Sequence, residues 1–124
     1  MTIEAAIYEF MSSFEIPAYP ISSVPDNRPF PYITYETTIG DGWDGELTFP
    51  ANVWYRTESE AVLNAKVREI YKAVGSGGRL LRCDDGLIWL KRGTPWAQSV
   101  SVEGTDEDIK RRYLNFDVEF LTSD

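Results

Sequence analysis

The C-terminal segment alternates apolar and polar residues in a way that strongly limits the folds open to the chain. Between Arg111 and Leu121 every second residue is apolar, and the residues between them are mostly polar or acidic. Successive side chains of a strand point to opposite faces of a sheet, so the pattern predicts a strand with one dry and one polar face. The dry face requires a cover of apolar side chains.

Two amphipathic helices are predicted to supply that cover. The first spans Thr2–Phe14, where apolar residues recur at steps of three and four and Thr2 is a suitable cap. At the start of the second helix Thr57 or Ser59 can act as the cap, Thr57 with Glu60 fits a capping box, and Gly75 is placed to end the helix. Its apolar stripe consists of Leu63, Val67, Ile70 and Val74.

The first pair of predicted strands follows a stiff connection that holds five of the seven prolines. Tyr32–Ile39 is β-branched and aromatic, and Leu47–Arg56 resumes an extended pattern after a glycine-rich loop, so we expect antiparallel neighbours. Pro50 lacks a backbone donor. We therefore expect the second strand to be an edge strand or to contain a bulge near that point.

The second half of the chain contains the remaining strands. The segment LLRCDDGLIWLK predicts a hairpin that turns at residues 84–86. Trp96–Val102 predicts a further strand, and Lys110–Leu121 predicts the last one. The expected fold is a single α+β domain over residues 1–124, with two amphipathic helices packed on one face of a mainly antiparallel β-sheet. That arrangement leaves the other face to solvent or to a partner.

Charge and cysteine content exclude several classes of protein. Cys83 is the single cysteine, so no intrachain disulfide can form, and no apolar run approaches membrane-spanning length. We therefore expect a soluble protein of cytoplasmic character. Residues 1–60 carry a net charge of -8, residues 61–102 of +4 and residues 103–124 of -4. A net acidic chain is a poor non-specific DNA binder. Segments of opposite charge suit contacts between neighbouring subunits. They are equally well explained as a solvated surface whose charges happen to cluster.

The residue pattern predicts no catalytic residue, no metal site and no cofactor site. The chain has no histidine, which removes the commonest general base. Asp41, Asp44 and Glu46 crowd one loop and could ligate a hard cation, but acidic turns are common. Asp117 and Glu119 lie about 7 Å apart on one strand face, a spacing compatible with glycosidase carboxylates, although a solvated surface explains them better. An enzyme is not expected.

Three segments resemble the small tail-terminator or tail-completion proteins of long-tailed bacteriophages. They are RPFPYITYE, VWYRTESEAVLNAKVREIYKAV and RRYLNFDVEFL, and the resemblance in organisation covers most of the chain. Related head–tail joining proteins share the pattern. The loop GDGWDGE and the hairpin LLRCDDGLIWLK do not correspond to features of the family.

The resemblance implies a homo-oligomeric ring, commonly of six subunits, in the virion. Such a ring binds the last ring of the tail tube, halts its polymerisation and offers a surface for the head-side connector. It implies assembly in the bacterial cytoplasm without a membrane, catalysis or a cofactor. Asp117 and Glu119 could then face the channel, where carboxylates would repel passing DNA.

Tryptophans and loop acids are the candidate contact residues, because Trp is enriched among interface hot spots. The candidates are Trp43, Asp41, Asp44, Trp54, Trp89 and Trp96. For Trp54 and Trp89 a half-buried core position is an equally good explanation, since both lie within predicted strands. Two other functions stay open: another head–tail connector or minor capsid protein, and, in a different class, a small cytoplasmic enzyme or ligand-binding domain that uses the exposed sheet face.

Overall fold

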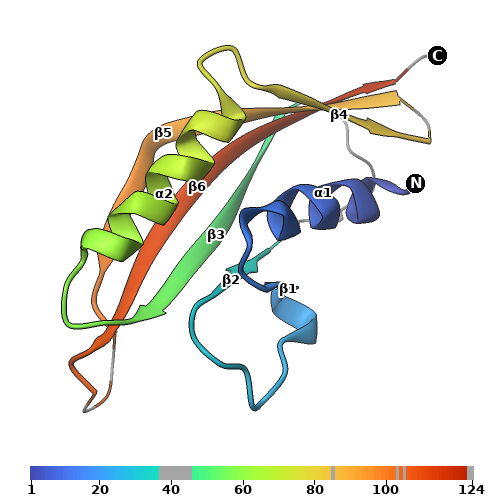
Figure 1. The fold of residues 1–124 in the computed structure, drawn as a ribbon. Coiled ribbons are helices and arrows are strands. Elements are labelled where there is room, and N and C mark those ends of the chain that lie inside the picture. Colours follow the sequence, from blue (N-terminus) through green and yellow to red (C-terminus); the bar gives the residue numbers. More distant parts are fainter. Residues whose placement is uncertain (37–45, 85, 103, 105, 123–124) are drawn as a thin grey trace.

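The computed structural model describes residues 1–36, 46–84, 86–102, 104 and 106–122. Over these residues the chain is a mixed α+β fold with a curled six-stranded sheet and two α-helices (Figure 1). In chain order the elements are α1 (Ile3–Met11), a 3-10 turn η1 (Ser12–Phe14), β1 (Ala18–Pro20), a second 3-10 turn η2 (Ile21–Ser23), β2 (Tyr32–Tyr35), β3 (Glu46–Arg56), α2 (Ala61–Val74), β4 (Arg79–Cys83), β5 (Gly86–Val100) and β6 (Ile109–Thr122). No helix among the described residues is long and apolar enough to cross a membrane.

The helices form where the apolar periodicity predicts them. In α1, Thr2 Oγ1 accepts a hydrogen bond of 3.0 Å from the Ala5 amide, which confirms the cap. The predicted capping box of α2 is wrong. Glu60 is the N-cap without a side-chain capping bond, and its carboxylate accepts a hydrogen bond from Arg112 of β6. The Oγ of Ser59 accepts a hydrogen bond of 3.1 Å from the Ala61 amide at the first position of the helix.

The C-terminus of α2 ends at Gly75, as predicted. The backbone φ of this residue is +82°, a conformation that favours glycine, and its amide bonds to the Tyr71 carbonyl.

The strand order in the sheet is β1-β2-β3-β6-β5-β4. β1 pairs with β2 in parallel, and the other neighbours are antiparallel, including the predicted pair β2 and β3. The short β1 was not predicted, because three residues between prolines carry no periodic signal.

The expectation of an edge strand or a bulge at Pro50 is wrong. β3 lies inside the sheet, and its ladder with β6 runs from Glu46 to Arg56 without a register shift. Pro50 is tolerated because its missing amide falls one residue past the described ladder with β2, which ends at the pair Tyr35 and Ala51.

The prediction of a separate strand at Trp96–Val102 is also wrong. These residues continue β5, which is one long strand that bends where the register with β6 shifts, between Arg92 and Ala97. Gly93 fits this bend because an added Cβ would lie 2.8 Å from Asn115 of β6. The bend lets β5 and β6 curl together, as Figure 1 shows.

One cluster of buried side chains forms the core. Both helices contribute to it, together with alternate residues of the long strands, such as Phe49, Ala51 and Val53 of β3 and Leu114, Phe116 and Val118 of β6. The predicted dry face of the C-terminal strand is therefore confirmed.

Candidate interaction surfaces

The polar side of β6 carries a mixture of charges. Asp117 and Glu119 alternate with the buried residues of β6, and both are partly exposed. Thr48 Oγ1 of β3 donates to Asp117 Oδ1 over 3.3 Å. Lys91 Nζ of β5 lies 3.8 Å from Glu119 Oε2 and 4.6 Å from the ring centre of Trp89. The two carboxylates therefore have polar neighbours on the strands at either side.

Trp54 belongs to a row of stacked side chains on this side of the sheet. Its ring lies 5.9 Å from that of Tyr32, with 16° between the ring planes, and 5.2 Å from the Arg111 guanidinium. Its Nε1 donates to Thr34 Oγ1 over 3.0 Å. The Arg28 guanidinium carbon lies 5.1 Å from the centre of the Tyr32 ring. The row fixes the proline-rich connection against β2, so Trp54 is an intramolecular contact that is only partly exposed.

Trp89 and Trp96 differ in their surroundings. Trp89 is partly exposed, and its Nε1 donates to the Gly77 carbonyl over 2.9 Å. Trp96 packs edge-on against Phe116 at 5.1 Å and against Tyr71 of α2 at 5.9 Å. The other candidate contact residues, Trp43, Asp41 and Asp44, lie outside the described residues.

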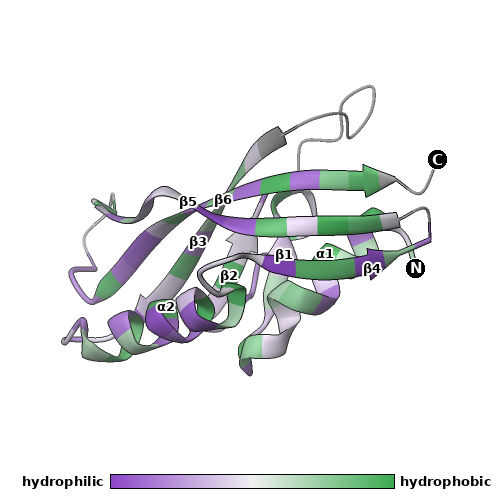
Figure 2. Cartoon of the chain, turned by 90° about the horizontal axis from the view of Figure 1, so that it is seen from above, coloured by the Kyte–Doolittle hydropathy of each residue, from purple (hydrophilic) through white to green (hydrophobic). Residues whose placement is uncertain are grey.

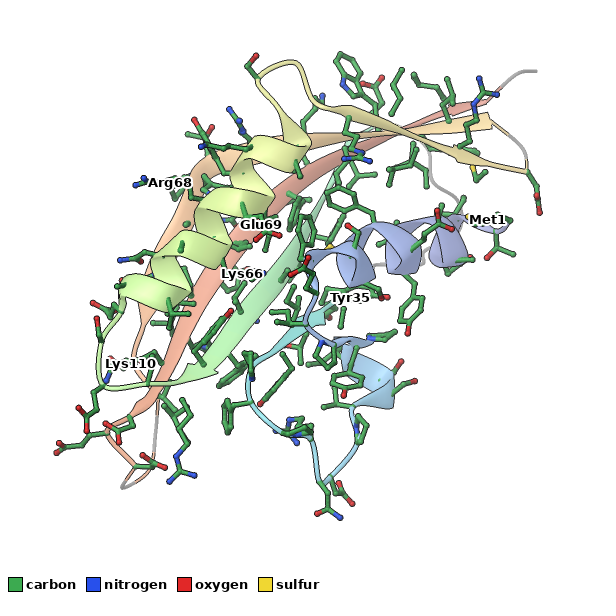
Figure 3. The ribbon with its side chains drawn as sticks, in the orientation of Figure 1. Met1, Tyr35, Lys66, Arg68, Glu69 and Lys110 are labelled. Carbon is green, nitrogen blue, oxygen red and sulfur yellow. The ribbon has the colours of Figure 1, made fainter. Side chains whose placement is uncertain are left out.

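Several basic side chains of the 61–102 segment are engaged within the molecule. Arg92 donates to the Tyr71 carbonyl from Nε over 2.9 Å and from Nη2 over 2.7 Å, and its guanidinium lies 3.3 Å from the centre of the Tyr71 ring. Lys66 Nζ donates to the Phe14 carbonyl over 2.6 Å and pairs with Glu69 at 3.0 Å. Figure 3 shows Lys66 and Glu69 on the side of α2 that faces α1. Net charge along the sequence therefore overstates the basic surface.

Arg112 is a buried charge that the sequence argument missed. It is 8% exposed and donates to Asn64 Oδ1 over 2.7 Å, to Glu60 Oε1 over 3.2 Å and to Ser99 Oγ. A signal for it exists in the sequence, because Arg112 is in phase with the apolar residues of β6 that start at Leu114. The cluster joins β5, β6 and the start of α2.

Two buried tyrosines have perturbed acidity. Burial, reinforced by the neighbouring Tyr8, raises the pKa of Tyr35 to about 12. Burial also raises the pKa of Tyr55, against an opposing effect of Lys66. Both phenols are neutral at physiological pH.

An open cavity of about 540 Å³ lies between α1 and β4. Apolar lining residues such as Phe10 and Leu81 alternate with charged ones such as Glu9, Arg79 and Arg82. Its single cysteine, Cys83, has its thiol against the Gly86 carbonyl at 3.5 Å. Within the described part of the chain, no three His, Cys, Asp or Glu side chains gather in a way that would hold a metal ion.

Comparisons with protein-family models, with curated proteins and with solved structures found no match for the chain.

Proposed function

We propose that the chain is a non-enzymatic virion assembly protein, a tail-terminator-like ring subunit that caps a phage tail tube and joins tail to head. One support is the resemblance of the three segments RPFPYITYE, VWYRTESEAVLNAKVREIYKAV and RRYLNFDVEFL to tail-terminator and tail-completion proteins. The other is the arrangement of side chains on the sheet.

The main support for the proposal is that the long strands carry two distinct sets of side chains, one buried and one exposed. One alternate set on β3 and β6 enters the buried cluster to which both helices contribute. The other set, which includes Thr48, Asn115, Asp117 and Glu119, keeps partial or full exposure. We infer that both helices cover the same face of the sheet and leave the second face for contacts with other proteins.

The chemistry of this second face suits a protein contact. Trp54, Trp89 and Tyr113 lie on it with partial exposure. Large aromatic residues and arginine are enriched in protein interfaces, whereas a solvated sheet face usually carries small polar and charged residues. Arg111 beside Trp54 adds a guanidinium to the same set.

In a ring, the part of this face around Asp117 and Glu119 lines the channel. The carboxylates there disfavour adhesion of DNA, which passes as cargo without specific binding. Lys91 lies close to Glu119 and is paired with Asp117 across the β5–β6 ladder, so the repulsion is moderate.

The partners are other copies of the chain, the tail tube protein and a connector protein of the head. The place of action is the head–tail junction of the virion, with assembly in the bacterial cytoplasm and no membrane step. Ring contacts between unlike surfaces of neighbouring subunits, rather than a two-fold contact, allow such a closed assembly.

The test is sedimentation of the purified protein with tail tubes and, separately, with portal complexes of the same phage. Co-sedimentation with tubes is expected. Binding to portal complexes alone would assign the chain to the other head–tail connectors. Binding to neither would contradict the proposal and favour the small enzyme or ligand-binding domain.

A further inference from the structure

An exposed apolar patch covers the ends of β4, β5 and β6. Leu80 pairs with Trp89 across the β4–β5 ladder, and Leu87 pairs with Leu121 across the β5–β6 ladder. Paired residues point to the same face, so these four side chains adjoin one another. Leu80 is 56% and Leu121 38% exposed. Figure 2 shows hydrophobic residues on these three strands lying side by side. Together with Arg82, these residues form the β4 patch.

Among the described residues, Arg82 gives the β4 patch an exposed positive charge. Glu119 at its border is paired with Lys91, and Asp84 is paired with the N-terminal ammonium group. Arg82 is exposed, and within the described part of the chain no carboxylate pairs with it. A partner for this patch should therefore combine apolar side chains with a free carboxylate.

A second exposed patch, the η2 patch, lies where α1 meets η2 and the end of β2. It contains Tyr8, which is 50% exposed, and Ile21, which is 55% exposed. Tyr8 lines a cavity of about 410 Å³ together with Glu4 and Tyr35. Ile21 borders an adjoining hollow with Glu36. None of the described residues that line the two hollows is basic, so the carboxylates of Glu4 and Glu36 leave this patch negative.

The two patches lie on opposite sides of α1. With 3.6 residues per turn, Ala6 and Phe10 lie on the helix face opposite Glu4 and Tyr8. Ala6 and Phe10 line the cavity beside β4, whereas Glu4 and Tyr8 line the cavity beside η2. Figure 1 shows β4 and β1 on either side of α1. A contact between unlike patches can therefore repeat from one copy to the next without blocking itself.

We propose that the β4 patch of one subunit binds the η2 patch of the next. Leu80 and Leu121 pack against Tyr8 and Ile21 of the neighbour, and Arg82 pairs with Glu4 or Glu36. The occupant of each patch is a second copy of this chain, because the two surfaces match in apolar character and are opposite in charge. This inference deepens the proposed function and rests on it for the ring.

The first experiment blocks one patch at a time and measures mass by light scattering and sedimentation. Leu80→Asp disables the β4 patch, and Ile21→Asp disables the η2 patch, so each variant alone should be monomeric where the wild type associates. Mixed one to one, they should form a dimer and nothing larger, since each supplies one intact patch. Val62→Asp is the matched control, because Val62 is an exposed apolar residue of α2 outside both patches.

The second experiment swaps charges. Arg82→Glu should weaken self-association at least about tenfold, the effect of losing roughly 1.4 kcal/mol of binding free energy. The added changes Glu4→Lys and Glu36→Lys should restore it in the same chain. Arg68→Glu is the control, since Figure 3 shows Arg68 on the outer side of α2. Circular dichroism and thermal unfolding of every variant establish that the fold is retained.

Three results would overturn the inference: a wild type that is monomeric at every attainable concentration, a mixture that forms no dimer, and variants that associate as well as the wild type. Failure here is distinguishable from failure of the proposed function. Tube binding by a protein that does not use these patches leaves the function and removes the inference. Self-association through these patches without tube binding would leave the inferred contact and remove the proposed function.

Discussion

At the scale of single residues, Arg112 shows how a charged residue enters the core of this protein. It occupies a position of the buried set of β6, and its guanidinium contacts Asn64, Glu60 and Ser99. A buried charge is tolerated only where hydrogen bonds and an opposite charge replace its water. Alternation predicted the dry face and places Arg112 in phase with it, but the strand's own sequence does not show the partners, which come from α2 and β5.

Replacing Glu60 with Ala should lower the free energy of unfolding by about 1–3 kcal/mol, because Arg112 then keeps its charge without an ionised partner. Urea unfolding measures the change. Glu58→Ala is the matched control, since Glu58 is an exposed carboxylate two residues away. Equal stability of the two variants would mean that Glu60 contributes no more than a surface carboxylate does.

Tyr35 should make the protein less stable at alkaline pH. Its pKa is raised to about 12 in the folded state, whereas an unfolded tyrosine titrates near 10. Above pH 10 the unfolded chain therefore loses the proton first, and stability falls between about pH 10 and pH 12, by about 1–3 kcal/mol. Below pH 10 the phenol is protonated in both states and has no such effect.

The measurement is urea unfolding of wild type and Tyr35→Phe at pH 8 and pH 11. Lysines also titrate in this range, so the informative quantity is the difference between the two proteins. The Phe variant should lose less stability on going to pH 11. A parallel loss in both would show that Tyr35 does not titrate differently in the folded state.

At the scale of elements, the connection between α2 and β4 requires a glycine at position 78 more strictly than at position 77. Gly78 has φ of +84°, and an added Cβ would lie 2.5 Å from Trp89 Nε1 and 2.8 Å from the Leu90 carbonyl oxygen. Gly77 has nothing within 4 Å of the same added atom. The sequence GSGG predicted only a helix end and did not distinguish the two positions.

Gly78→Ala should lower the free energy of unfolding by about 2–4 kcal/mol, through backbone strain and overpacking against β5. Gly77→Ala should change it by less than about 1 kcal/mol. Thermal or urea unfolding of the two variants gives the comparison. Similar values for both would contradict the close approach of this turn to Trp89.

The elements with strong periodicity were predictable, and those set by long-range pairing were not. Both helices and the dry face of β6 follow from the spacing of apolar residues in the sequence. The spacing does not predict that the segments before and after Pro95 form the single strand β5, because they are held together by pairing with β6 on both sides of the bend. The internal position of β3 depends in the same way on partners far along the chain.

At the scale of the whole molecule, charge summed along the sequence was a poor guide to surface charge. Arg92 and Lys66 belong to the basic 61–102 segment and bond to backbone carbonyls of the fold. Arg82 of the same segment stays exposed. The charges that remain exposed and unpaired after folding can therefore be identified only from the structure.

The candidate interaction surface could be predicted only in part from the sequence. The polar face of the C-terminal strand and its two carboxylates follow from alternation. The β4 patch does not, because Leu80, Trp89 and Leu121 come from three strands whose register sets them side by side. The same holds for Trp54, whose row with Tyr32 and Arg111 depends on pairing across β2, β3 and β6.

Electron microscopy of tail tubes incubated with the purified protein tests whether the chain assembles into a ring on a tail tube. We expect a ring at one end of each tube, with Asp117 and Glu119 facing the channel and tube growth halted at that end. Bare tube ends, with the protein left free in solution, would mean that the chain is not a tail terminator.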